Sequence, residues 1–132
     1  MNAVLRSVGA GLVLGALLVA PAWAQMAPTG VQKVMTSKGE VWADANGMTL
    51  YTYDRDTEAN KSTCAGNCAN NWPPLMAEAA AMGMGDWSIA DRPDGSKMWA
   101  FKGKPLYLWA RDTARGDVTG DGVGGVWHIA TP

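Results

Sequence analysis

Short runs of alternating hydrophobic and polar residues, separated by glycine-containing turns, follow one another from about residue 31 to the end of the chain. Successive side chains of a strand point to opposite faces, so this alternation predicts β-strands. The seven strands that we expect cover residues 31–36, 40–43, 48–53, 87–91, 96–101, 105–109 and 127–130. Asn46-Gly47 and Asp94-Gly95 lie between neighbouring strands. Such pairs are the strongest short-range signals of a β-hairpin.

Two segments between the strands carry a helical signal. The cysteine segment, residues 64–68, is predicted to form one helical turn and is closed by Trp72-Pro73-Pro74. Residues 75–82 are rich in alanine, which has the highest helix propensity, and Gly83 follows them. The sequence therefore predicts a mainly β fold with one or two short helices.

An internal repeat becomes visible when the sequence is shifted by 56 residues. Residues 47–57 then lie over residues 103–113, and six of these 11 positions are identical. The identical pairs are Gly47/Gly103, Leu50/Leu106, Tyr51/Tyr107, Arg55/Arg111, Asp56/Asp112 and Thr57/Thr113. We therefore expect a small single domain of two pseudo-repeated antiparallel β-meanders, at about residues 31–75 and 87–130, packed together because neither copy buries its apolar face alone.

Each copy contains the pattern Tyr-x-aromatic-x-x-Asp. The six motif residues are Tyr51, Tyr53, Asp56, Tyr107, Trp109 and Asp112. The two aromatic side chains of each copy share a face of the strand, because they stand two positions apart. The aspartate comes where the strand is expected to end, and there it can accept a backbone N–H and fix the following turn. We therefore interpret the six residues as structural.

This repeated motif is accompanied by Cys64-Ala-Gly-Asn-Cys68 and by Trp72-Pro73-Pro74-Leu75. Together these segments resemble a bacterial family of secreted repeats of unknown function, often described as predicted lipoproteins with a Yx(F/W/Y)xxD motif. The resemblance covers about residues 31–130. It implies a secreted two-repeat domain and no particular activity. The chain lacks the lipidated cysteine of the lipoprotein members, so the resemblance implies no membrane anchor here.

Residues 1–24 are predicted to be a secretory signal peptide, since Arg6 precedes an apolar run and Ala22-Trp23-Ala24 has the A-x-A pattern of a cleavage site. The secreted-repeat domain would then be residues 25–132, in the periplasm or outside the cell, with no lipid anchor. The apolar run is too short to span a bilayer. Removal of Arg6 leaves a formal net charge of −2, which excludes the basic surface of a nucleic-acid-binding protein.

Cys64 and Cys68 are the only two cysteines of the chain. An even number of cysteines in a small secreted domain favours a disulfide, and one that encloses three residues would fix a local turn. A redox-active pair is the alternative, although a thioredoxin-like motif has two residues between its cysteines rather than three.

Two groups of residues are candidate metal ligands. Asp117 and Asp121 stand where an EF-hand loop places oxygen ligands for calcium, but His128 occupies the place of its bidentate glutamate. Met82 and Met84 supply thioether sulfur, which suits Cu(I). The simpler interpretations are a polar, glycine-rich turn for the first group and core packing for the methionines.

Six tryptophans follow the predicted leader, and they either fill the core or offer a platform for sugars. Trp42 pairs with Trp99 across the repeat, and Trp72 with Trp127, which favours the core. The sequence has no nucleophile elbow, phosphate-binding loop or zinc-protease motif. We therefore expect a non-enzymatic envelope module with a binding or structural role, whose partner or small ligand is unknown. Periplasmic handling of copper or calcium, and a small redox protein that uses the cysteine pair, remain as alternatives.

Overall fold

The computed structural model describes residues 27–132, so the predicted signal peptide lies outside the described residues. Within that range the chain forms seven strands, one short α-helix and one 3-10 helix. In chain order the elements are β1 (Val31–Thr36), β2 (Gly39–Asp44), β3 (Tyr51–Tyr53), α2 (Asn67–Asn71), β4 (Trp87–Asp91), β5 (Lys97–Phe101), β6 (Lys104–Pro105), η1 (Val123–Gly125) and β7 (Trp127–Ile129). The mainly β fold class is therefore confirmed.

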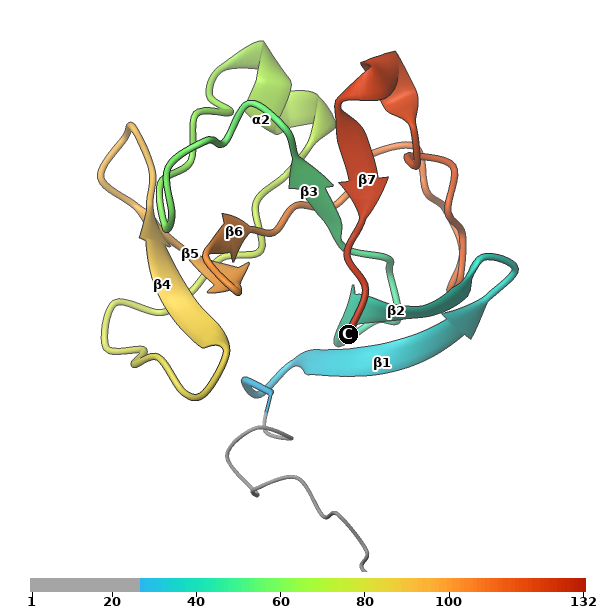
Figure 1. The fold of residues 1–132 in the computed structure, drawn as a ribbon, viewed down its shortest axis with the longest axis horizontal. Helices are drawn as coiled ribbons and strands as arrows, with labels where there is room; N and C mark the ends of the chain where they lie inside the picture. The colour runs from blue at the N-terminus through green and yellow to red at the C-terminus, as the bar shows by residue number, and fades with distance from the viewer. Residues whose placement is uncertain (1–26) are drawn as a thin grey trace, which may run out of the picture.

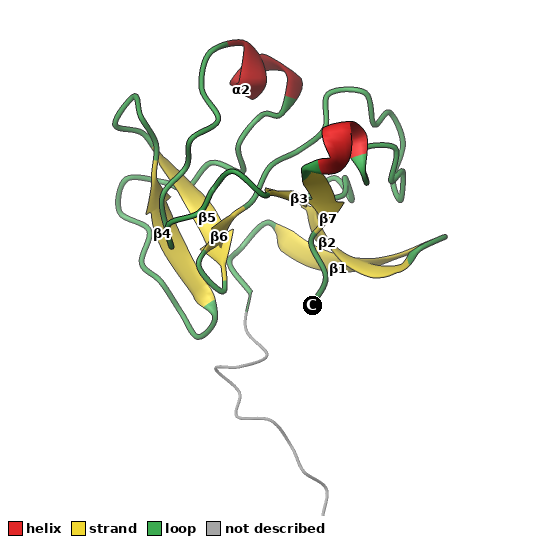
Figure 2. Ribbon diagram, turned by 45° about the horizontal axis from the view of Figure 1, so that its top comes forward, coloured by secondary structure: helices red, strands yellow, loops and turns green. Residues whose placement is uncertain are grey.

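The strands form three small antiparallel sheets: β1 with β2, β3 with β7, and β4 with β5 and β6 (Figure 1). In the first hairpin Val31 faces Asp44 and Thr36 faces Gly39. Gly39 has a φ of +99°, which a side chain rarely adopts, and this conformation lets the chain reverse tightly after β1. The short helices α2 and η1 lie at the end of the molecule opposite β1 in Figures 1 and 2.

The two copies are interlocked. The tyrosine strand of the first copy, β3, pairs with β7, the closing strand of the second copy. The tyrosine segment of the second copy pairs in the same way with the closing segment of the first. Tyr107 forms an antiparallel β-bridge with Pro74, and the backbone N–H of Leu108 donates to the Pro73 carbonyl at 2.7 Å. Each copy therefore completes a sheet that the other copy begins.

The centre of this arrangement is a reciprocal contact between the two motif tyrosines. The Tyr51 N–H donates to the Tyr107 carbonyl at 2.8 Å, and the Tyr107 N–H donates to the Tyr51 carbonyl at 2.9 Å. Residues directly opposite each other in an antiparallel pair exchange both hydrogen bonds in this way. The two equivalent tyrosines thus meet where the two copies join.

Tryptophan fills much of the core. Five of the six tryptophans beyond the predicted leader are buried, with exposed fractions of 8% or less: Trp42, Trp72, Trp87, Trp99 and Trp127. The sixth, Trp109, is half-buried. Trp42 and Trp99, which the repeat pairs, take equivalent places. The backbone N–H of Trp42 donates to the Ala130 carbonyl, and the backbone N–H of Trp99 donates to the Leu75 carbonyl, each at 2.9 Å. The core interpretation of these five residues is confirmed.

The prediction of a helix at residues 75–82 was wrong. Its first residues are extended, since the Leu75 N–H donates to the Leu106 carbonyl and the Ala77 N–H to the Lys97 carbonyl, and residues 79–80 form a turn. The part of β5 that β6 does not cover offers Leu75 and Ala77 hydrogen-bond partners, and this pairing outweighs the helix propensity of the segment. The strands predicted at 48–53 and 105–109 are also shorter, as β3 and β6.

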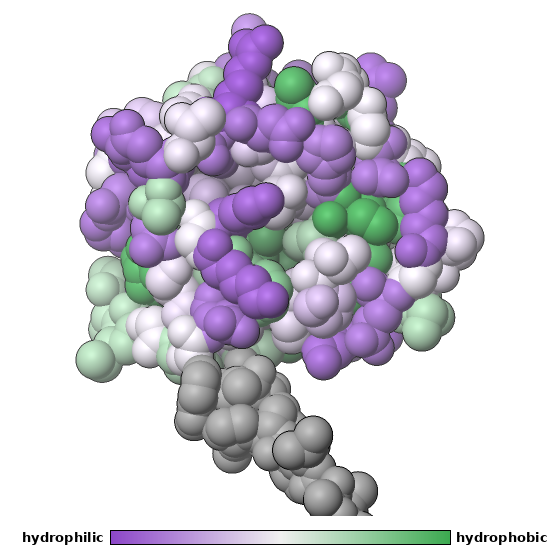
Figure 3. Space-filling model, viewed as in Figure 1, coloured by the Kyte–Doolittle hydropathy of each residue, from purple (hydrophilic) through white to green (hydrophobic). Residues whose placement is uncertain are grey.

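The surface in Figure 3 is mostly polar, and the hydrophobic residues on this face are scattered rather than gathered in one broad patch. Among residues 27–132, no helix has both the length and the hydropathy that crossing a membrane requires.

Candidate functional site

The motif tyrosines and aspartates form two equivalent hydrogen bonds between the copies. The Tyr51 hydroxyl donates to Asp112 Oδ2 at 2.5 Å, and the Tyr107 hydroxyl donates to Asp56 Oδ2 at 2.5 Å. Both tyrosine side chains are fully buried. The tyrosine of each copy is therefore held by the aspartate of the other.

The second oxygen of each aspartate fixes a turn in its own copy. Asp112 Oδ1 accepts from the N–H and the hydroxyl of Thr119, at 3.0 and 2.6 Å. Asp56 Oδ1 accepts from the same two groups of Thr63, at 2.8 and 2.7 Å. Each carboxylate thus joins a local turn to the distant tyrosine and is saturated by these contacts.

The tyrosine hydroxyls are held in their protonated form. Burial raises the pKa of Tyr51 and of Tyr107 well above the usual value, and the hydrogen bonds to Asp112 and Asp56 raise both pKa values further. A group whose pKa lies far above neutrality does not act as a general base at neutral pH. The two hydroxyls therefore act as hydrogen-bond donors between the copies.

The remaining two motif residues, Tyr53 and Trp109, lie at the two ends of a stack of four aromatic rings. Tyr53 stacks on Trp127 with ring centroids 4.2 Å apart, Trp127 on Trp72 at 3.7 Å, and Trp72 on Trp109 at 4.0 Å. Tyr53 and Trp109 are equivalent residues of the two copies, and both are half-buried. Gly120 allows this packing, because a Cβ there would lie 2.8 Å from the Tyr51 ring and 3.0 Å from Trp72.

The cysteines form the expected disulfide, Cys64–Cys68. Cys64 is 1% exposed and belongs to the same core cluster as the stacked tryptophans. The Cys68 carbonyl accepts from the Trp72 N–H at 2.8 Å. The bridge therefore holds the helix α2 that leads into the aromatic stack.

The residues considered for calcium have other partners. Asp121 forms an ion pair with Lys38 at 2.9 Å, and His128 Nε2 lies 2.8 Å from Asp54 Oδ2. Asp117 accepts from the N–H groups of Thr113 and Ala114, and these contacts lower its pKa. Among the described residues, no three histidine, cysteine, aspartate or glutamate side chains form a group suited to a metal ion.

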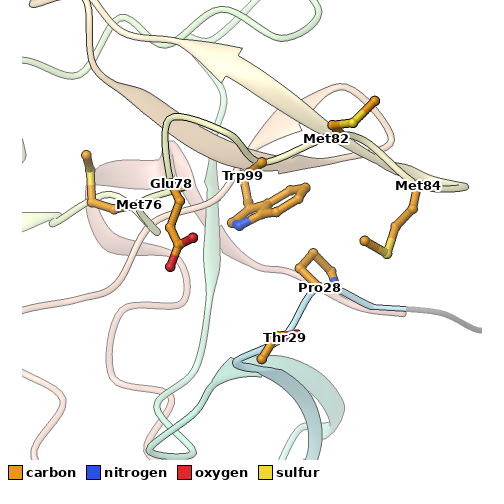
Figure 4. A pocket seen from close by; sticks show the side chains of 8 residues that line it. Pro28, Thr29, Met76, Glu78, Met82, Met84 and Trp99 are labelled. Carbon is orange, nitrogen blue, oxygen red and sulfur yellow. The ribbon is translucent and has the colours of Figure 1, made fainter.

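The two methionines considered for copper lie together at one pocket of about 330 Å³. Met82, Met84 and Met76 line it, together with Trp99 and Glu78 (Figure 4). In the close-up, Met82 and Met84 lie on one side of Trp99, and Met76 and Glu78 lie on the other. The sequence therefore indicated two residues that the fold brings to the same site.

A further pocket, of about 350 Å³, involves residues that the sequence analysis did not single out. It lies between the turn after β4 and the segment after β3, where Lys61 forms a parallel bridge with Asp91. Arg92 lines this pocket with Lys61, Ser62, Thr63, Asp91 and Pro93, and the Asp91 carboxylate is paired with Lys97. A single arginine in a polar turn carries no sequence signal, so only the fold reveals this site.

The Arg92 side chain is only 7% exposed, yet its Nε and Nη1 atoms are buried without a hydrogen-bond partner. The carboxylate of Asp94 lies 3.7 Å from Nε, is 64% exposed and already accepts from the Ser96 N–H and hydroxyl. Buried guanidinium groups are normally paired. Arg92 is therefore a buried cation whose ion pair with Asp94 is long and leaves Nε and Nη1 without a hydrogen bond.

The pocket also adjoins the contact between the copies. The oxygens of the Ser62 and Tyr107 hydroxyls lie 2.7 Å apart, and Arg92 is close enough to oppose part of the rise in the pKa of Tyr107. Lys61, at the rim, is 62% exposed and 3.4 Å from Glu58. The site thus combines a buried guanidinium, an exposed ammonium and a serine hydroxyl.

Comparison with known families adds one finding. A family model described as a secreted repeat of unknown function matches residues 33–76 and again residues 88–131. No curated protein and no solved structure is significantly similar to the chain.

Proposed function

The chain belongs to the family of secreted repeats of unknown function, and from this premise we propose that it is a non-enzymatic module that binds an anionic group of the cell envelope at the Arg92 pocket. The single observation that carries the proposal is the buried Arg92 guanidinium, whose Nε and Nη1 donors have no partner.

A buried charge costs several kcal/mol unless close partners offset it, and the exposed Asp94 carboxylate, 3.7 Å from Nε, offsets little of that cost. A ligand that pairs with Arg92 would therefore be favoured. Guanidinium presents its donors in a planar fork that matches the two oxygens of a carboxylate, sulfate or phosphate. Lys61 adds positive charge at the rim, whereas the hydroxyl protons of Ser62 and Thr63 are already donated to Tyr107 and to Asp56. The two cations are therefore the groups that would hold an anion. The ligand class that best fits these groups is an oxyanion.

A binding role agrees with the hydrogen bonds that already occupy the aspartates and tyrosines of the repeated motif. Asp56 and Asp112 are saturated by hydrogen bonds, and the hydroxyls of Tyr51 and Tyr107 stay protonated. Acid–base catalysis needs a group whose pKa lies near the working pH. These four residues therefore support the domain, and the Arg92 pocket supplies its binding surface.

The proposal is tested by thermal unfolding of the secreted protein in chloride buffer, with inorganic phosphate, sulfate or an oligomer of galacturonic acid added. An anion that binds only the folded state stabilises it, by about 1.4 kcal/mol at ten times its Kd. For a domain of this size that rise corresponds to about 6 °C in Tm. A larger rise with the oligomer than with the free ions would identify a polymer as the source of the anion.

The decisive variant is R92M, which replaces the guanidinium with an apolar side chain of similar length. We expect its Tm without anion to equal or exceed that of the wild type, because a buried unpaired charge is removed, and we expect the anion-dependent rise to vanish. R55M is the matched control, since Arg55 is exposed and outside the pocket, and it should keep the full rise. A wild-type protein that does not respond, an R92M variant that responds fully, or a large loss of stability in R92M would each refute the proposal.

A further inference from the structure

Two of the three methionines of the pocket in Figure 4 are exposed, and the third, Met84, is half-buried against the core cluster that contains Trp99. Met82 is 79% exposed and Met76 is 54% exposed, whereas Met98 is fully buried. Methionine in a core fills irregular gaps, and Met98 fits this role. Packing does not explain two exposed thioethers around one pocket.

Met82 and Met84 are presented by a fixed piece of backbone. The N–H and carbonyl groups of Met84 and Trp87 hydrogen-bond reciprocally at 2.9 Å, which joins this segment to the start of β4. A Cβ on Gly83, between the two methionines, would lie 2.9 Å from the Trp87 carbonyl oxygen, so the backbone here approaches β4 closely. The segment is thus anchored, while its unbranched side chains keep their rotamer freedom.

The two side chains lie beside the indole of Trp99. In Figure 4, Met84 reaches over Pro28 into the pocket, and Met82 extends from the rim. Met82 is 79% exposed, so its side chain is free to change rotamer within nanoseconds. The indole of Trp99 borders the pocket, and tryptophan is the aromatic side chain that best attracts a cation.

We propose that this pocket binds monovalent copper through the sulfur atoms of Met82 and Met84, next to the Trp99 ring. Thioether sulfur is a soft ligand that selects Cu(I), whereas calcium and magnesium take oxygen ligands. Among the described residues that line the pocket, Glu78 carries the only carboxylate, and it lies on the other side of Trp99 from Met82 and Met84. The site shares no lining residue with the Arg92 pocket and is independent of the anion-binding function.

The test is competition for Cu(I) between the purified secreted protein and the chelator bicinchoninate, with ascorbate present and oxygen excluded. A thiol assay first verifies that Cys64–Cys68 stays oxidised, because free thiolates also bind Cu(I). We expect one Cu(I) per chain in the wild type and at least a tenfold weaker affinity in M82L/M84L. Leucine has a volume close to that of methionine, and an unchanged Tm verifies that the double variant is folded.

M35L is the matched control, because Met35 is 72% exposed on β1 and does not line the pocket. It should bind copper as the wild type does, and R92M should do so as well, which separates this site from the anion site. Failure of the wild type to hold copper against the chelator would overturn the proposal. Unchanged affinity in M82L/M84L, or an equal loss in M35L, would overturn it too.

Discussion

The hydroxyl of Tyr51 is a single group on which two segments depend. It donates to Asp112 and accepts from the Gly120 N–H at 3.2 Å. In Y51F both partners stay buried and lose this contact, and a hydrogen bond to a charged group contributes about 1.5–3 kcal/mol. We therefore expect Y51F to lower the free energy of unfolding by about 2 kcal/mol, measured by urea denaturation.

Tyr53 provides the matched control for this prediction. It has the same ring, two residues further on, but its hydroxyl makes no hydrogen bond in the part of the chain that the structure describes. Y53F should therefore change the stability by less than about 0.5 kcal/mol. If Y51F were as stable as the wild type but lost anion binding, the motif would belong to the binding site and not to the architecture.

Single residues differ in how far the sequence reveals them. The motif tyrosines and aspartates could be found because each occurs twice at the same spacing. Met82 and Met84 could be found because they are close in sequence. Arg92 could not, because its unusual feature is burial without a partner, which depends on Lys61 and Ser62 from another segment.

Among the elements, the disulfide loop has the most local role. The Cys64–Cys68 disulfide encloses three residues. Removing a disulfide that closes so short a loop raises the entropy of the unfolded chain and lowers the free energy of unfolding by about 2 kcal/mol. C64A/C68A should therefore be about 2 kcal/mol less stable than the wild type in urea denaturation and keep the same fold by circular dichroism.

Reductant provides the control for the disulfide prediction. It should lower the stability of the wild type to that of C64A/C68A and leave the variant unchanged. A cysteine pair that is reduced at a potential far above that of a resistant structural bridge would instead favour the redox alternative.

Elements that depend on local alternation were predictable, and those that depend on distant partners were not. The β1–β2 hairpin has its own turn, so its pattern was sufficient. The composition of residues 75–77 favours a helix, but these residues pair with Lys97 and Leu106, which are 20 and 31 positions away. Helix propensity is too weak, at a few tenths of a kcal/mol per residue, to resist such pairing.

The repeat predicts that the molecule consists of two packed copies, but only the structure shows how the strands of the two copies pair. Self-similarity predicted two packed copies, and they are present. It did not predict that β3 pairs with β7 of the other copy, because hydrogen-bond partners across a repeat leave no trace in the spacing. The interlocking places Tyr51, Tyr107 and both aspartates on one shared contact, so the stability of the domain depends on it as a unit.

That shared contact predicts how the whole domain responds to alkali. In the unfolded chain Tyr51 and Tyr107 ionise near pH 10, whereas in the folded state burial and the aspartates raise both pKa values and keep the protons bound. Above about pH 10 the folded state therefore binds more protons than the unfolded state, and its free energy of unfolding falls as the pH rises. The slope is up to about 1.4 kcal/mol per pH unit for each tyrosine.

Urea denaturation from about pH 8 to about pH 11 measures this slope, and Y107F separates the tyrosines from the lysines that titrate nearby. All lysines are the same in both proteins, so the difference between the two slopes belongs to Tyr107 alone. We expect stability to be flat below about pH 9 and the wild type to lose stability more steeply than Y107F above about pH 10, because the variant has one proton fewer to retain. Equal slopes would mean that the Tyr107 hydroxyl ionises as readily in the folded domain as in the unfolded chain, and hence that the contact between the copies opens without unfolding.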